Sequence, residues 1–166
     1  MPDLLWDDVR DFFDPELMGS LPDVCVPGTT AGDWQAVFDL VRSRGWAWTY
    51  EQDGVLGPLP RAADLSERQS DAGTPTLAVS PVPGVTAIFR MYSAAEVDFD
   101  VDLRELRGQR GVDVLCAFLR AVGRRLGKAV LMSAEGDHGH PVLGFDPAVG
   151  RVVVVDDAAP NRLLRI

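Results

Sequence analysis

The segment from Glu135 to His140 holds the side chains of this sequence that are best suited to chemistry. It contains both histidines of the chain, His138 and His140, together with the carboxylates of Glu135 and Asp137. Imidazole and carboxylate groups can bind Zn²⁺ or another divalent ion, or transfer protons as general acid and base. A His-x-His pair is a weak motif, and no separate third histidine or cysteine completes a ligand set. We therefore interpret the segment as a polar surface turn, with a metal site at Asp137, His138 and His140 as the alternative.

An acidic ladder occupies alternate positions between residues 96 and 102. Its members are Glu96, Asp98, Asp100 and Asp102. In a β-strand these side chains share one face, with successive members about 7 Å apart. That spacing is too wide for one metal ion without outside ligands. The ladder predicts either a solvated strand face or a patch that binds a basic partner.

The two cysteines do not indicate catalysis. Cys25 stands just before a Pro-Gly-Thr-Thr turn, but the chain has no Walker Gly-Lys-Ser/Thr motif and no arginine at phosphatase-loop spacing after it. Cys116 lies beside the apolar stripe of an expected helix, and we expect it to be a small buried residue. We predict no catalytic residue and no cofactor, and an enzyme is the less favoured interpretation.

Acidic residues are concentrated at the N-terminus. The chain of 166 residues has a net charge of −9. Residues 1–23 carry seven acids and one base, Arg10, so most of the negative charge lies there. Apolar residues at helical spacing predict an acidic amphipathic helix within residues 1–22, with Asp3 as its N-cap and Asp7, Asp8 and Asp11 on its polar side. Pro15 should stop this helix or force a break in it. Such a helix either packs on the core or binds a basic partner, and the overall charge disfavours nucleic acid as a partner.

Hydrophobic periodicity predicts an α+β fold. Apolar residues at helical spacing indicate helices over 31–44 and 112–126. Alternating patterns indicate strands at 24–27, 46–51, 85–92, 97–103, 129–134, 142–146 and 151–156. Short connections between neighbouring strands favour antiparallel pairing. We expect a mostly antiparallel sheet with the two helices packed on one face, in addition to the N-terminal helix.

The hairpin of 85–92 and 97–103 has a well-specified register. Pairing Met91 with Val97 places Phe89 opposite Phe99, so that one face is entirely apolar. The other face then sets Arg90 opposite Asp98, which is a favourable cross-strand pair.

The chain has the length and composition of one domain, 1–166. We expect an α+β core over 23–157, a long loop at 52–75 and a tail at 158–166. No apolar run is long enough for a membrane span, and no signal peptide is expected, so the predicted location is the cytoplasm. The 15 arginines against one lysine are the codon signature of a high-GC bacterium.

The element order and the acidity are similar to those of small secretion chaperones and bacterial immunity proteins. This similarity is one of topology and charge, and a fold does not determine a function. It implies a non-catalytic module that binds a basic protein through the acidic N-terminal helix and the acidic ladder. The alternative is a small enzyme or a ligand-binding or metal-binding protein that uses the segment from Glu135 to His140.

Overall fold

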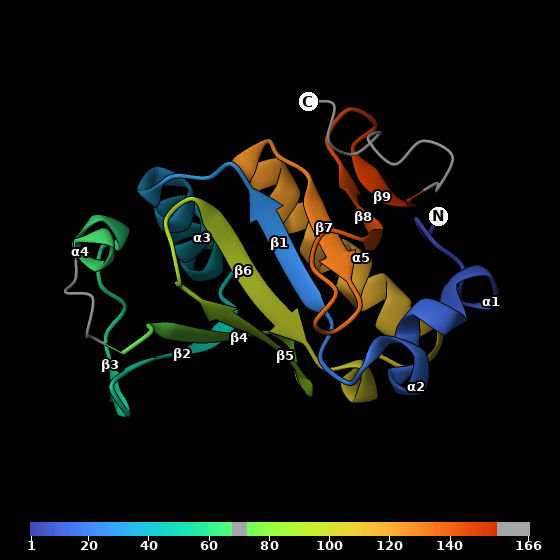
Figure 1. Cartoon of the computed structure of the whole chain (residues 1–166), viewed down its shortest axis with the longest axis horizontal. Coiled ribbons are helices and arrows are strands. Elements are labelled where there is room, and N and C mark those ends of the chain that lie inside the picture. The colour runs from blue at the N-terminus through green and yellow to red at the C-terminus, as the bar shows by residue number, and fades with distance from the viewer. Residues whose placement is uncertain (68–72, 156–166) are drawn as a thin grey trace.

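A nine-stranded antiparallel sheet forms the framework of the protein (Figure 1). The computed structural model describes residues 1–67 and 73–155. The strand order is β3-β2-β4-β5-β6-β1-β7-β8-β9, so β1 lies between β6 and β7, which come much later in the chain. The α+β class predicted from the sequence is confirmed. The expected tail at 158–166 lies outside the described residues.

The strands are β1 (Asp23–Pro27), β2 (Ala47–Gln52), β3 (Val55–Gly57), β4 (Thr76–Val82), β5 (Val85–Arg90), β6 (Glu96–Val101), β7 (Val130–Ser133), β8 (Pro141–Asp146) and β9 (Arg151–Val154). Each predicted strand segment overlaps one of these strands, but β3 and β4 match no strand segment predicted from the sequence. The helices are α1 (Trp6–Val9), α2 (Pro15–Met18), α3 (Ala31–Ser43), α4 (Ala62–Ser66) and α5 (Gly108–Leu126), with 3₁₀ turns η1 (Arg10–Phe13) and η2 (Leu103–Glu105). The expected loop at 52–75 thus contains a short strand and a short helix.

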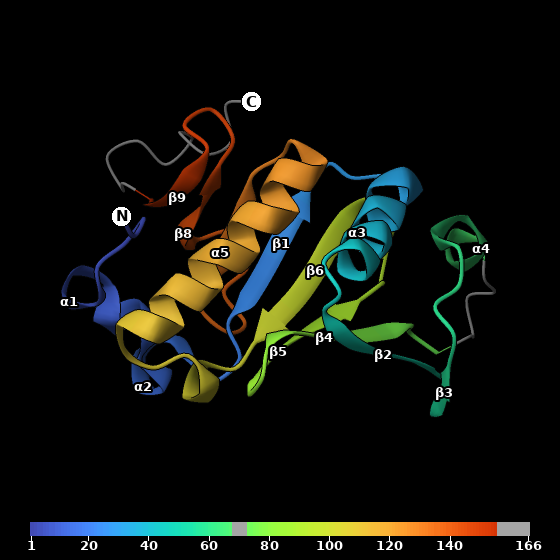
Figure 2. The same ribbon diagram turned by 180° about the vertical axis from the view of Figure 1, so that it is seen from behind.

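The two long helices lie on the same face of the sheet (Figure 2). A capping box starts α3, because the Thr30 side chain accepts from the Asp33 N–H while the Asp33 carboxylate accepts from the Thr30 N–H. Phe118 of α5 packs edge-on against Phe89 and Phe99 of the sheet. These rings belong to one continuous core between helices and sheet. In the described part of the chain, no long helix lies over the opposite face of the sheet, and we call it the open face (Figure 1).

Strand alternation in the β5–β6 hairpin sends apolar side chains to the core and charged ones to the open face. Phe89 pairs with Phe99, and Arg90 pairs with Asp98, as the sequence predicts. A shift of one residue would bury the carboxylates, so the apolar pattern determines the register.

The acidic N-terminal segment is helical only in short pieces. Pro15 starts a new turn, whose N-cap Asp14 accepts a hydrogen bond from the Glu16 N–H, so α1, η1 and α2 replace one continuous helix. Asp3 is not an N-cap: its carboxylate bonds Arg120 of α5 at 2.7 Å and the Val152 N–H of β9 at 2.9 Å. These contacts attach the start of the chain to the core.

The aromatic stripe at the start of β2 belongs to the hydrophobic core. Tyr50 is buried, and Trp46 and Trp48 are partly buried against the core. Tyr50 therefore serves packing, whereas Trp46 and Trp48 each keep part of their surface exposed. Within residues 1–67 and 73–155, no helix is both long and apolar enough to cross a membrane.

Candidate functional site

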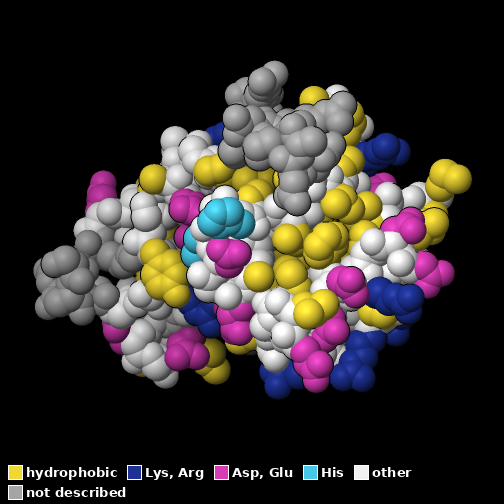
Figure 3. Space-filling view, turned by 45° about the vertical axis from the view of Figure 1, so that its right-hand side comes forward, with side chains coloured by type: hydrophobic (Ala, Val, Ile, Leu, Met, Phe, Trp, Pro, Cys, Tyr) yellow, Lys and Arg dark blue, Asp and Glu magenta, His cyan; other side chains and the backbone are white. Residues whose placement is uncertain are grey.

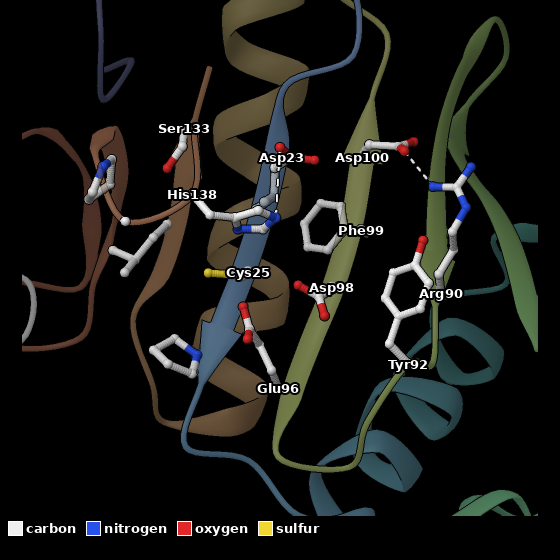
Figure 4. Close-up of a pocket in the computed structure, with 15 residues that line it drawn as sticks. Asp23, Cys25, Arg90, Tyr92, Glu96, Asp98, Phe99, Asp100, Ser133 and His138 are labelled. Atoms are coloured by element: carbon white, nitrogen blue, oxygen red, sulfur yellow. Dashed lines mark hydrogen bonds and ion pairs between the residues drawn. The ribbon is translucent and has the colours of Figure 1, made fainter. Parts of the chain in front are cut away.

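A hollow of about 590 Å³ lies on the open face, over β1 and β6. Four carboxylates line it: Asp23 from β1, and Glu96, Asp98 and Asp100 from β6. They meet because β1 pairs antiparallel with β6, which sets Asp23 opposite Asp100 and Cys25 opposite Asp98. We call this cavity the acidic hollow. Figure 4 shows the carboxylates around the Cys25 thiol, with His138 on one side and Tyr92 on the other.

One arginine faces this cluster of acids. The Cα atoms of Arg90 and Asp98 are register partners, but the Arg90 guanidinium forms its ion pair with Asp100, one step along the strand (Figure 4). Arg90 is the only lysine or arginine among the described residues that line the hollow. Asp98 therefore lies beside Glu96 with no ion pair to a lysine or arginine in the described part of the chain, and only the charge of His138 opposes that of Glu96.

The protonation of Asp98 reflects this arrangement. Partial burial, and then the charge and hydrogen bond of Glu96, raise its pKa to about 6. A carboxylate next to a second carboxylate is costly to ionise, because like charges repel where water screens them poorly. The pair Glu96–Asp98 is thus a site of unbalanced negative charge that a cation would stabilise.

The Cys25 thiol forms part of the floor of the acidic hollow. Burial raises its pKa to about 12, with the Glu96 hydrogen bond and nearby carboxylates acting in the same direction. A reactive cysteine needs the opposite, a lowered pKa that yields thiolate at neutral pH. Cys25 consequently suits a structural role better than nucleophilic chemistry.

The segment from Glu135 to His140 contributes one side chain to the hollow. His138 lines it, with Nε2 3.8 Å from Asp23 Oδ2. The same Asp23 carboxylate accepts the Gly136 N–H at 2.9 Å, which fixes the loop beside the sheet. A histidine side chain lies among acidic side chains on this part of the surface (Figure 3).

The three residues of the predicted metal site do not converge. His140 Nδ1 is 2.9 Å from Asp137 Oδ1, both side chains are largely exposed, and neither lines the hollow with His138. Among the described residues, no group of three or more histidine, cysteine, aspartate or glutamate side chains could hold a metal ion. The enzyme or ligand-binding alternative for this segment therefore relies on His138 alone.

The remaining predicted partner-binding residues lie outside the acidic hollow. Asp102 leaves the strand, caps η2 and pairs with Arg104 at 2.7 Å, and this bond lowers its pKa. Asp7, Asp8 and Asp11 are exposed in the N-terminal segment and do not line the hollow. That segment packs near the start of α5, where the Trp6 N–H donates to Gln109 at 2.7 Å. The structure thus separates two acidic surfaces.

Sequence reasoning missed Asp23 and Tyr92 as members of the site. From the sequence, Asp23 is only one of the acids of the N-terminus. It lies two residues before Cys25 on β1, so both side chains point to the same face of the sheet. That alternation is a usable signal, but the pairing of β1 with β6 spans some seventy residues and has no local signature. Tyr92 follows β5 and remains exposed at the rim of the hollow.

This sequence was compared with protein-family models and with curated protein sequences. No protein-family model matches it. No curated protein sequence matches it either. A proposal for the function of this protein therefore uses the geometry and charge of the acidic hollow.

Proposed function

We propose that this protein is a non-catalytic protein-binding module that receives a basic partner on its open face, in the manner of an immunity protein or a secretion chaperone. A lysine or arginine of the partner enters the acidic hollow and lies between Glu96 and Asp98. The observation that carries this proposal is the carboxylate pair without its own cation, in which Asp98 has a pKa of about 6.

Asp100, the next acid of the ladder after Asp98, shows how a cation binds to this surface. Arg90 reaches across the strands and pairs with Asp100, although Asp98 is its register partner. A guanidinium group of the partner would form the corresponding ion pair with Asp98 and Glu96. Charge-assisted hydrogen bonds of this kind are about twice as strong as neutral ones.

The surroundings of the pair suit a protein ligand better than a free ion. The hollow is open to solvent and has an exposed tyrosine, Tyr92, at its rim. Tyrosine and arginine are enriched among the residues that dominate binding energy at protein interfaces. A partner side chain would bring its cation to the carboxylates and its aliphatic stem to Tyr92.

The acids of the N-terminal segment have a different role in this proposal. Asp7, Asp8 and Asp11 are exposed and lie away from the hollow, so they attract a basic partner at long range without contacting its anchoring side chain. Such steering raises the association rate and disappears at high salt.

A labelled peptide of alternating arginine and serine tests the proposal by fluorescence anisotropy. The variant Glu96→Gln/Asp98→Asn removes two charges from the hollow, and Asp7→Asn/Asp8→Asn removes two from α1. At physiological salt we expect the first variant to raise the Kd about tenfold. The second should change it by less than about twofold, because exposed charges are screened over about 8 Å.

Equal effects of the two variants would contradict the proposal, because the peptide would then respond to net charge alone. A peptide in which glutamine replaces arginine provides the second control and should not bind measurably.

A further inference from the structure

The helix-bearing side of the molecule carries a groove lined by arginines. Two hollows, of about 480 and 320 Å³, share the wall residues Val82, Arg110 and Val114, so they are neighbours and we treat the pair as one groove. Its lining includes residues of the N-terminal half of α5, from Arg110 to Phe118. Four arginines line it, against the acids Glu105 and Asp113; we call it the arginine groove, with Arg44, Arg104, Arg107 and Arg110.

An aromatic surface forms the wider end of the arginine groove. Trp46 is only partly buried, and its ring centroid lies 5.2 Å from that of Phe118. The Arg44 guanidinium carbon lies 5.8 Å from the centre of the Trp46 ring, within the range of a cation–π contact. An apolar side chain placed here would contact the indole while remaining close to a cation.

Much of the positive charge of the groove is not neutralised by the protein. Arg104 is paired with Asp102 at 2.7 Å. In residues 1–67 and 73–155, no ion pair involves Arg44, Arg107 or Arg110.

The two acids of the groove already accept hydrogen bonds from their neighbours. The Glu105 carboxylate accepts the Thr86 N–H at 3.1 Å, and the Asp113 carboxylate accepts from Gln109 at 2.8 Å. The exposed guanidinium groups of Arg107 and Arg110 thus remain for a ligand of opposite charge.

We propose that the arginine groove binds an acidic segment of a protein partner that carries one large apolar side chain. The acidic side chains pair with Arg107 and Arg110, and the apolar side chain lies against Trp46. This site is independent of the acidic hollow, which occupies the other face of the sheet. A short acidic segment is favoured over nucleic acid, because a long polyphosphate carries one charge per nucleotide and is repelled more strongly by the net charge of −9. Single strands also bind on successive aromatic rings, whereas of the two rings that line the described part of the groove Phe118 is buried and only Trp46 is accessible.

Fluorescence anisotropy of a labelled acidic peptide with one central phenylalanine tests this proposal. The variants Arg110→Ala and Arg125→Ala form a matched pair, because both arginines are exposed on α5 and only Arg110 lines the groove. We expect Arg110→Ala to raise the Kd about tenfold and Arg125→Ala to change it less than about twofold. Replacing the phenylalanine of the peptide with glycine should also weaken binding about tenfold.

Four results would overturn the proposal. Equal effects of Arg110→Ala and Arg125→Ala would show that binding depends on the overall positive charge of α5 and not on the groove. An unchanged Kd for the glycine peptide would remove the apolar contact. Tighter binding of a single-stranded oligonucleotide that displaces the peptide would assign the groove to nucleic acid. A dimer of the wild-type protein that Arg110→Ala abolishes, measured by sedimentation, would assign it to a second copy.

Discussion

At the scale of single residues, the ion pair between Arg90 and Asp100 determines which carboxylates of the open face lack a cation. The Arg90 guanidinium could have neutralised Asp98, its register partner, but it pairs with Asp100 instead. Asp98 is left beside Glu96, and burial together with that neighbour raises its pKa to about 6. A folded protein that tolerates such a pair gives up stability there, which is a common property of binding sites.

The substitution Asp98→Asn should stabilise the free protein at neutral pH. The pKa of Asp98 is about 6 when folded and near 4 when unfolded, so its contribution to stability is complete below about pH 4 and is lost as the pH rises through 6. Allowing for solvent screening of a half-exposed group, we expect the variant to gain about 1 kcal/mol near pH 7.5 and nothing near pH 4. Urea denaturation at both pH values measures this difference.

Asp100→Asn is the matched control on the same strand face. It removes the partner of Arg90 and should lower the free energy of unfolding near pH 7.5. A decrease for Asp98→Asn as well would contradict the account of an unbalanced carboxylate pair.

At the scale of elements, the sequence predicts helices, strands and hairpins that depend on neighbouring residues. It does not predict the pairing of strands that lie far apart in the chain. The register of the β5–β6 hairpin was predicted correctly because strict alternation allows one register only, although both strands end two residues before the predicted bounds. The break of the N-terminal helix at Pro15 was predicted, because proline disfavours a helical conformation at the residue before it. The change from α1 to the 3₁₀ turn η1 at Arg10 was not predicted. The insertion of β1 between β6 and β7 was not predicted, since the pairing of distant strands leaves no local pattern. The acidic hollow depends on that insertion, so only its β6 half could be found.

Close contact between α5 and β8 depends on Gly123. A Cβ atom at this position would overlap the Phe145 ring. We expect Gly123→Ala to lower the free energy of unfolding by about 1–3 kcal/mol through overpacking, which outweighs the better helix propensity of alanine. Thermal and urea denaturation measure the effect.

Gly32→Ala in the first turn of α3 is the control, since its Cβ would lie 3.4 Å from Thr30 Oγ1, an ordinary contact. It should leave stability unchanged or slightly raised. A Gly123→Ala variant as stable as the wild type would show that Phe145 can move aside without cost.

At the scale of the whole molecule, the net charge of −9 conceals a division into surfaces of different sign. The open face carries the acidic hollow, the N-terminal segment adds exposed acids, and the helix-bearing side carries the arginine groove. The two proposed sites have no lining residue in common and lie on opposite faces of the sheet, so we expect that they can be occupied together. Together they fit a partner that is basic where it meets the sheet and acidic where it meets α5.

The pKa of the Asp98 carboxyl group, followed by carbon NMR in the free protein and with the arginine-serine peptide, tests the central claim most directly. A guanidinium between Glu96 and Asp98 favours the ionised form, so the pKa should fall from about 6 in the free protein towards the ordinary value near 4. The same linkage makes binding weaken as the pH is lowered through 6. A pKa that stays near 6 while the peptide is bound would show that the basic side chain lies elsewhere, and the acidic hollow would lose its assigned role.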